Sequence, residues 1–289
     1  MRIPRFISVA LLVLVAALSS ACGYRSFNIN IGGDVGSGVA AEETRDIGSI
    51  HSVVLNTAGE LTIVRGETDS LSIHADDNIL PILSSEVADG VLTLDLKHGS
   101  NGYTTDLGVQ YQLTVTDLSK ITANSSSNVK AEALSGDTVT LILNGSGDIN
   151  VDRIEAEAAD FELASAGALE IMNLDARTVA LLIGGSGDAR IHHLKADTLD
   201  ARLMSAGDAV LSGEADHQEV RIQGSGSFNG DALAGDDATL ALSSSGSAGV
   251  NVAETLNVTI NGSGSVSYHG DPDLSQQISS SGRVVQAAS

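Results

Sequence analysis

The unit Asn144-Gly145-Ser146-Gly147-Asp148 recurs, with variation, along the second half of the chain. Its last glycine returns seven more times, at intervals of 20, 20, 20, 19, 20, 18 and 18 residues. The eight glycines are Gly147, Gly167, Gly187, Gly207, Gly226, Gly246, Gly264 and Gly282. Self-similarity at a fixed period near 20 residues is typical of a solenoid, in which each repeat forms one coil.

Apolar residues alternate on both sides of each glycine. In the first unit they are Leu141 and Leu143 before it, and Ile149 and Val151 after it. A period of two predicts short strands, so we expect an all-β, parallel (right-handed) β-helix with coils of about 20 residues and tight corners. An antiparallel β-sandwich also has many short strands joined by Gly/Ser turns and remains the structural alternative, although it does not require the same phase in every unit.

The corner glycines are predicted to adopt a positive φ, which other residues resist. The residue before each of them is always Ser or Ala. Small side chains at every coil predict a crowded stacking column at that position, with no room for anything larger than Ser.

The chain begins like an exported protein. Arg2 and Arg5 precede an apolar run over residues 6–18 and then small residues, so residues 1–21 are predicted to be a lipoprotein signal peptide. Cys22, the single cysteine, cannot form an internal disulfide. Its setting resembles the lipobox of bacterial lipoproteins, which implies lipid attachment at Cys22, and Gly23 after it favours the outer membrane. An ordinary signal peptide followed by an unmodified cysteine is the alternative.

The remaining chain divides by composition. Residues 22–45 are rich in Gly, Ser and other small residues and are predicted to be a flexible tether. Residues 46–289 are predicted to form the β-solenoid. Within it, residues 46–121 contain strand-like segments without a 20-residue period and are assigned to opening coils and a cap, because a solenoid end needs covering. Residues 122–285 are the regular repeats.

Charge and aromatic content exclude some functions. Without the two arginines of residues 1–21 the chain has 13 basic and 37 acidic residues, a net charge of −24. Nucleic acids and anionic lipid surfaces are bound by basic patches, so neither is an expected ligand. The absence of tryptophan, with only four Phe and four Tyr, disfavours a sugar cleft built on aromatic side chains.

Three aspartates follow corner glycines directly: Asp148, Asp188 and Asp208. Ala168 interrupts the series, but Asp188 and Asp208 would lie on adjacent coils, about 4.8 Å apart. Adjacent carboxylates can bind calcium or divide acid and base roles in a glycosidase. Aspartates also stabilise turns, and this interpretation is preferred, so the sequence assigns no metal site and no cofactor. The histidines lack metal-ligand spacing, and no serine has the Gly-x-Ser-x-Gly setting of a hydrolase nucleophile.

The repeated Gly-Ser-Gly-Asp and Ser-Ala-Gly-Asp corners, with the closing stretch at residues 261–272, resemble the GIN domain family over residues 47–285. Its members are described as autotransporter adhesin heads in bacterial envelope lipoproteins. The resemblance implies a parallel β-helix outside the cytoplasm and no established activity.

The expected function is therefore that of a non-enzymatic, lipid-anchored outer-membrane protein, adhesin-like or structural, facing the periplasm or the cell surface. The membrane, through the lipid anchor, and a protein or polysaccharide ligand are the expected partners. The alternative is a carbohydrate-active or calcium-dependent polysaccharide-binding β-helix that uses the three aspartates.

Overall fold

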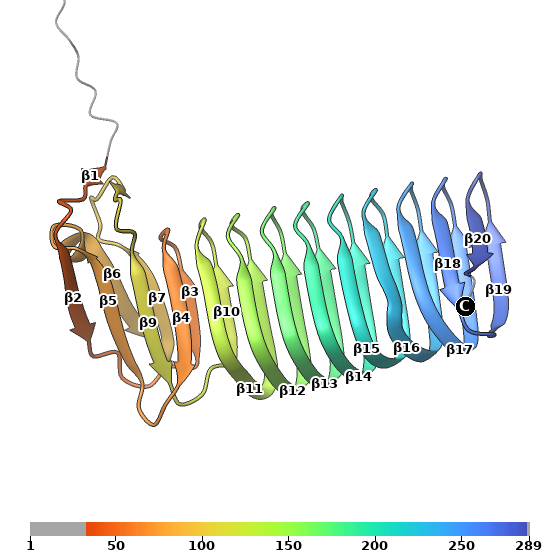
Figure 1. Ribbon diagram of the computed structural model, residues 1–289, viewed down its shortest axis with the longest axis horizontal. Coiled ribbons are helices and arrows are strands. Elements are labelled where there is room, and N and C mark those ends of the chain that lie inside the picture. Colours follow the sequence, from red (N-terminus) through yellow and green to blue (C-terminus); the bar gives the residue numbers. More distant parts are fainter. Residues whose placement is uncertain (1–32, 288–289) are drawn as a thin grey trace, which may run out of the picture.

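The computed structural model describes residues 33–287, which form a rod of stacked β-coils with a cap at its amino-terminal end (Figure 1). The predicted signal peptide and Cys22 lie outside these residues. Within residues 33–287 the one helical element is the 3-10 turn η1 (Leu80–Ile82), and no helix is long and apolar enough to cross a membrane.

Seven long strands make the regular coils, which lie side by side along the rod in Figure 1. Each pairs in parallel with the next, as Ile149 does with Leu169 and Leu169 with Ala189. The prediction of an all-β, parallel solenoid with coils of about 20 residues is therefore confirmed. The strands are β11 (Asn128–Leu143), β12 (Ile149–Leu163), β13 (Leu169–Ile183), β14 (Ala189–Leu203), β15 (Ala209–Ile222), β16 (Ser227–Leu242) and β17 (Ser247–Ile260).

Each coil has three walls, as the burial of side chains along β13 indicates. Buried and outward-facing residues alternate along the strand, but two consecutive side chains are exposed at Met172 and Asn173, and again at Arg177 and Thr178. Each exposed pair marks a bend, and the glycine corner at residues 184–188 is the third. We expected separate short strands. Instead, hydrogen bonding between coils continues around the bends, so each coil is one bent strand of 14 to 16 residues.

One apolar core runs the length of the rod. Equivalent positions in successive coils stack into ladders, and the members of one ladder are at most 1% exposed: Leu143, Leu163, Ile183, Leu203, Ile222, Leu242 and Ile260. Burying one such side chain contributes about 1.5–3 kcal/mol relative to leaving it in water. Because this burial is supplied by the neighbouring coils, no coil is stable alone.

Glycine is required at the corners because the backbone of the preceding coil leaves no room for a Cβ. The positive φ that the sequence predicted for these glycines is not the reason. Among the described residues, none of the eight has a positive φ. A Cβ on any corner glycine from Gly147 to Gly264 would lie closer than 3.0 Å to a backbone oxygen of the preceding coil. The Ser or Ala before each glycine is exposed, so the prediction of a crowded column at that position is wrong. The glycines themselves form the crowded column.

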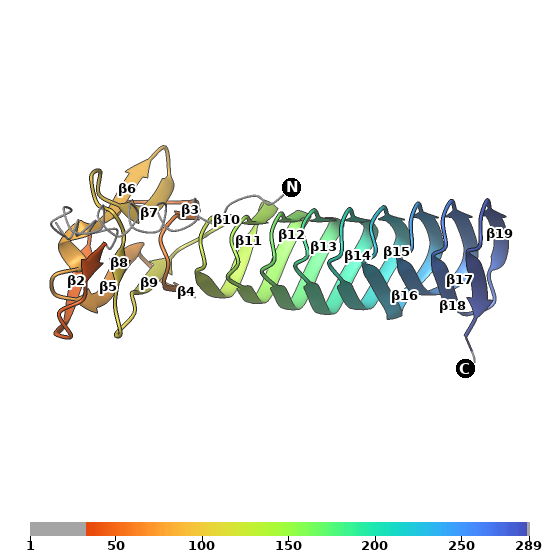
Figure 2. The ribbon, with the colours of Figure 1, turned by 90° about the horizontal axis from the view of Figure 1, so that it is seen from above.

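Two walls of the rod continue into the cap, where spatial order differs from chain order (Figure 2). One wall runs β11–β4–β9–β5–β2 and the other runs β10–β3–β7–β6. The pairs nearest the rod are parallel, and the outermost are antiparallel. The cap strands are β1 (Asp34–Val35), β2 (Ala40–Arg45), β3 (Ser52–Leu55), β4 (Glu60–Arg65), β5 (Ser70–Asp76), β6 (Leu83–Ala88), β7 (Val91–Leu96), β8 (Tyr103–Thr104), β9 (Gln110–Val115) and β10 (Lys120–Ala123).

The described part of the predicted tether is not a free linker. β1 pairs with β8 and β2 pairs with β5, so residues 34–45 belong to the cap. The buried Asp76 holds this segment, because its carboxylate accepts hydrogen bonds from the Gly38 amide, at 2.6 Å, and from the Thr105 hydroxyl. The Thr105 hydrogen bond is the main reason that the pKa of Asp76 lies below its ordinary value. These partners are 29 and 38 positions away in sequence, so local composition cannot reveal them.

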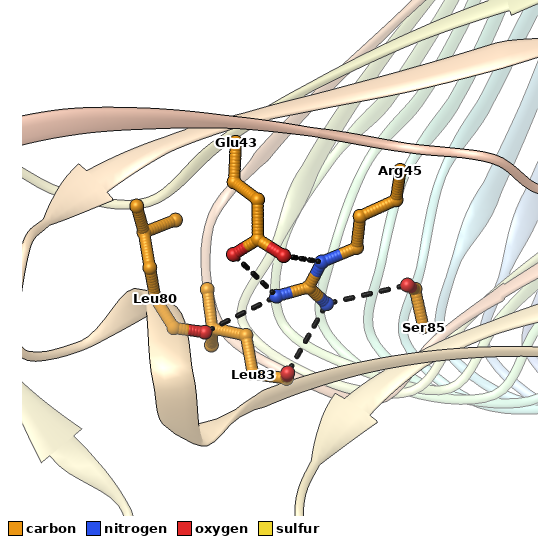
Figure 3. Close-up of polar contacts among 5 residues, drawn as sticks. All are labelled: Glu43, Arg45, Leu80, Leu83 and Ser85. Carbon is orange, nitrogen blue, oxygen red and sulfur yellow. Dashed lines mark hydrogen bonds and ion pairs between the residues drawn. The ribbon is translucent and has the colours of Figure 1, made fainter.

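Arg45 closes the cap over η1 (Figure 3). Its guanidinium donates to both carboxylate oxygens of Glu43, at 3.1 and 3.3 Å. It also donates to the backbone oxygens of Leu80 and Leu83, each at 3.1 Å, and to the Ser85 hydroxyl. A planar group with five donors can tie a strand to two carbonyls and a carboxylate at once. Arg45 therefore fixes β2 to η1 and β6.

The far end of the rod is built from three shorter strands: β18 (Ser265–His269), β19 (Asp273–Ile278) and β20 (Arg283–Gln286). β17 pairs in parallel with both β18 and β19, and β18 pairs with β20. In Figure 1 this end lies opposite the cap.

Candidate binding face

One wall of the rod presents a continuous outward surface, which we call the long face. It consists of the outward side chains one and three positions after each corner glycine, together with their neighbours in the cap. The first row in the rod is Asp148, Ala168, Asp188, Asp208, Ser227, Ser247, Ser265 and Arg283. It passes through Asn128 of β11 and continues into the cap as Glu60, Gln110, His74 and Glu42. The long face thus covers strands β2, β5, β9 and β4 and every coil from β11 onward.

The three predicted aspartates lie in the middle of the long face, where each accepts a hydrogen bond from a corner amide of the next coil. Asp148 Oδ1 accepts the Ala168 amide at 2.9 Å, and Asp188 Oδ1 accepts the Asp208 amide at 3.0 Å. Asp208 Oδ1 accepts both the amide and the hydroxyl of Ser227, each at 2.7 Å. In each pair the carboxylate satisfies a corner amide of the next coil, which supports the turn interpretation.

Ionisable side chains on and beside this face contact one another in pairs. Glu60 contacts Lys130 across neighbouring strands, and Glu170 Oε1 lies 2.8 Å from His192 Nε2. At the cap end, Glu42 Oε1 lies 3.4 Å from His74 Nε2. Between residues 33 and 287 no group of three or more His, Cys, Asp or Glu side chains is arranged to hold a metal ion.

Three hollows open along the long face. The one at the cap has a volume of about 400 Å³ and is lined by Glu42, His74 and Gln110. The middle one, of about 240 Å³, contains the three aspartates and Arg190. The third, of about 640 Å³, is lined by Ser227, Ser247, Ser265 and Arg283. Because the three lie on one wall, the arrangement suits contact with an extended partner rather than one enclosed small molecule.

Another hollow, of about 280 Å³, lies on a different wall. Ile142, Phe161 and Leu182 supply its apolar part, and Asp160 and Arg202 are among the charged residues around it. It is confined to a few neighbouring coils and does not continue along the rod.

An asparagine ladder at the corners was missed by the sequence analysis. Asn144 Nδ2 donates to Asn124 Oδ1, and Asn124 Nδ2 donates to Asn56 Oδ1, both at 2.8 Å. Asn56 in turn donates to Asp95 of the cap at 2.8 Å. The signal was present, because all three asparagines hold the same position in a corner unit. The ladder joins the first regular coils to the cap.

The geometry defines the class of protein as a parallel β-solenoid, closed by a cap at one end and carrying an open polar face. The chain belongs to the family described as "Putative auto-transporter adhesin, head GIN domain", whose model matches residues 51–172 and 161–272. The resemblance to this family is therefore confirmed. Comparison with curated proteins finds no match.

Solved structures share the fold. A protein from Parabacteroides distasonis ATCC 8503, described as a "putative lipid binding protein", is 21% identical with a TM-score of 0.66, and the match covers 88% of this chain and 99% of that one. A "putative adhesin" from Parabacteroides merdae ATCC 43184 is 20% identical with a TM-score of 0.62, covering 88% and 98%. A second P. distasonis protein, also described as a "putative adhesin", is 18% identical with a TM-score of 0.61 over the same shares.

Proposed function

We propose that this chain is a non-enzymatic, lipid-anchored outer-membrane protein that makes adhesive contacts through its long face. The observation that carries the proposal is the continuity of that face over the cap and every coil, with three hollows on one wall. Membership of an adhesin-like family supports a cell-envelope location. A protein or polysaccharide chain lying along the rod is the expected ligand.

The carbohydrate-active and calcium-dependent alternatives both use the three aspartates. Their Oδ1 atoms already accept hydrogen bonds from corner amides at 2.7 to 3.0 Å. These oxygens are therefore engaged in holding the corners, which is the role of turn residues. No observation within the described residues favours these alternatives over adhesion.

The anchor and the location are tested on cells that produce the full chain with a carboxyl-terminal tag. Cys22→Ala should move the protein from the membrane fraction to the soluble fraction, since Cys22 is the single cysteine and the predicted lipid attachment site. Protease added to intact cells should remove the tag while a periplasmic marker survives. A tag protected until the outer membrane is opened would refute the adhesive role and leave a structural role inside the envelope.

The role of the long face is tested with two pairs of bulky substitutions. Ser247→Tyr with Ser265→Tyr fills the hollow of about 640 Å³, because these serines pair on adjacent strands. Thr239→Tyr with Asn257→Tyr is the matched control, on paired strands of a different wall. We expect the first pair alone to reduce retention of cells on the surfaces that the unmodified protein binds. Equal retention for both pairs would contradict binding through the long face.

A further inference from the structure

The carboxyl-terminal end of the rod has an exposed edge. β19 pairs with β17 on one side, and no strand between residues 33 and 287 pairs with its other side. Leu256 and Ile260 of β17 are fully buried, whereas Leu274 and Ile278, which stack on them in β19, are each 38% exposed. The end of the apolar core and a row of backbone donors and acceptors therefore face outward together.

At the opposite end of the molecule the edge strand β2 is protected. It carries Glu42, Glu43 and Arg45, and Leu80 and Leu83 are buried beneath. Charges on an edge strand and a covering turn are the usual protection against unwanted strand pairing. β19 carries Asp273 at its first position, after Pro272, but its remaining residues, from Leu274 to Ile278, have neither a charge nor a proline.

We propose that the β19 edge binds the β19 edge of a second copy of this chain, antiparallel and about a two-fold axis. An antiparallel register centred on Gln276 places Leu274 opposite Ile278 of the other copy and Gln276 opposite its own equivalent. Apolar side chains then meet apolar ones, and two amides that can both donate and accept meet each other. A shift by one residue would place these inward side chains opposite outward ones, so the register is specified.

The pair is closed and does not grow into a fibre. Head-to-tail stacking would require the β19 edge to meet the cap of another copy, where η1 and the Arg45 contacts cover the core. An isologous contact uses the same surface on both copies and ends there. A single edge strand is a small interface, so pairing in solution is weak and is strengthened where many copies are anchored to one surface.

This inference deepens the proposed function and rests on it. If the chain is anchored near residue 22, the cap is the membrane-proximal end and β19 the distal end, as their opposite positions in Figure 1 require. An end-to-end pair then has its two anchors at the outer ends of a doubled rod. Such a pair would join two facing membranes, and the partner of the adhesin would be the same protein on a neighbouring cell.

The test uses cysteines at positions that the register makes neighbours. One strain produces the full chain with Ser275→Cys and another, with a different tag, produces Gln277→Cys. After mixing and mild oxidation, we expect a disulfide-linked pair carrying both tags, well above the level for either variant alone or for the unmodified chain. The matched control is Asn257→Cys mixed with Thr259→Cys, at the same positions one coil earlier, where β19 already covers the strand.

Charge provides a second measurement, in which cell–cell aggregation is scored. Ser275→Glu with Gln277→Glu places like charges opposite each other and should abolish aggregation, whereas Ser275→Lys with Gln277→Glu places opposite charges there and should restore it. Mixed cysteine crosslinks no stronger than the control would overturn the pairing, and crosslinks to a different protein would overturn the choice of partner. Either result, with the tag still sensitive to external protease, would leave the proposed surface role intact.

Discussion

Replacing Gly187 by Ala tests the idea that the rod is limited by backbone crowding at its corners. A Cβ at Gly187 would lie closer than 3.0 Å to the Gly167 oxygen of the preceding coil. The same corner contains a matched control in Gly184, where the nearest atom to an added Cβ is the Leu163 oxygen at 3.8 Å. Neither glycine has a positive φ, so the two substitutions differ in crowding and not in backbone strain.

The two substitutions should change the free energy of unfolding in different directions. Overpacking at Gly187 should lower the free energy of unfolding by about 1–3 kcal/mol, because the added Cβ would clash with the backbone of the preceding coil, which cannot move away easily. Gly184→Ala should be neutral or stabilise by up to about 1 kcal/mol, since it restricts the unfolded chain without a clash. At roughly 2–4 °C per kcal/mol for a domain of this size, Gly187→Ala should melt several degrees below Gly184→Ala.

Thermal unfolding followed by circular dichroism measures the difference, and urea unfolding checks it at constant temperature. Because a solenoid loses cooperativity when one interface between coils is weakened, Gly187→Ala should also broaden the transition. Equal midpoints for the two variants would refute the crowding argument. A melting temperature of Gly187→Ala at or above that of the unmodified protein would refute it as well.

Three further predictions concern the cap and the core. The pKa of Asp76 lies below its ordinary value of 3.8, so its contribution to stability is complete above that value and is lost as the pH falls through the lower folded pKa. Thr105→Val should move this loss towards higher pH, which acid unfolding measures. Arg45→Lys should lower the free energy of unfolding by about 1–3 kcal/mol, because Lys cannot hydrogen-bond two carbonyls and a carboxylate at the same time. Faster hydrogen exchange of the β2 amides would measure this loss. Gln218→Leu should raise the urea midpoint, by up to about 1 kcal/mol in free energy of unfolding, because the buried Oε1 of Gln218 has no hydrogen-bond partner among the described residues. The bonds that its Nε2 donates to the Ala215 and Leu233 oxygens, at 3.4 and 3.3 Å, are long, so their loss offsets only part of this gain.

The rod could be predicted from the sequence because each coil repeats the same short-range pattern. The glycine interval and the alternating apolar residues are local features, and stacking them in register determines the long-range contacts. The reason for the glycines could not be predicted in this way. A positive φ and a close approach between coils are two different reasons for a glycine, and they look the same in the sequence. The structure decides between them, because Gly187 has no positive φ and the Gly167 oxygen leaves no room for a Cβ there.

The cap was harder to predict, because its partners are distant in sequence. β3 lies between β7 and β10, and β2 pairs with β5 across an intervening 24 residues. Arg45 shows the same difficulty at one residue. It ends a stretch whose Gly and Ser content predicts a tether, yet its bonds to Leu80 and Leu83 make it part of the cap. The amino-acid composition of a segment indicates whether it would be flexible in isolation, but it does not indicate which part of the protein the segment packs against.

The candidate site was partly visible in the sequence. Asp148, Asp188 and Asp208 share the position after a corner glycine and line one hollow, but the pattern could not tell which groups their oxygens contact. The extension of that face over β4, β9, β5 and β2 depends on the cap pairings and had no sequence signal.

A repeat that stacks on itself has no internal reason to stop, so each end of the rod must be ended by residues that depart from the pattern. The cap differs from the repeat in several ways: it has antiparallel strands, a charged edge strand and the contacts of Arg45 with η1. At the other end the strands are shorter, and within β19 the apolar ladder is broken by Gln276 in place of the Val258 of the preceding coil. One amide within an otherwise apolar ladder weakens further stacking, yet it leaves Leu274 and Ile278 in the arrangement that an inverted copy can match. The two ends therefore differ in kind, because one stops pairing and the other restricts pairing to a single geometry.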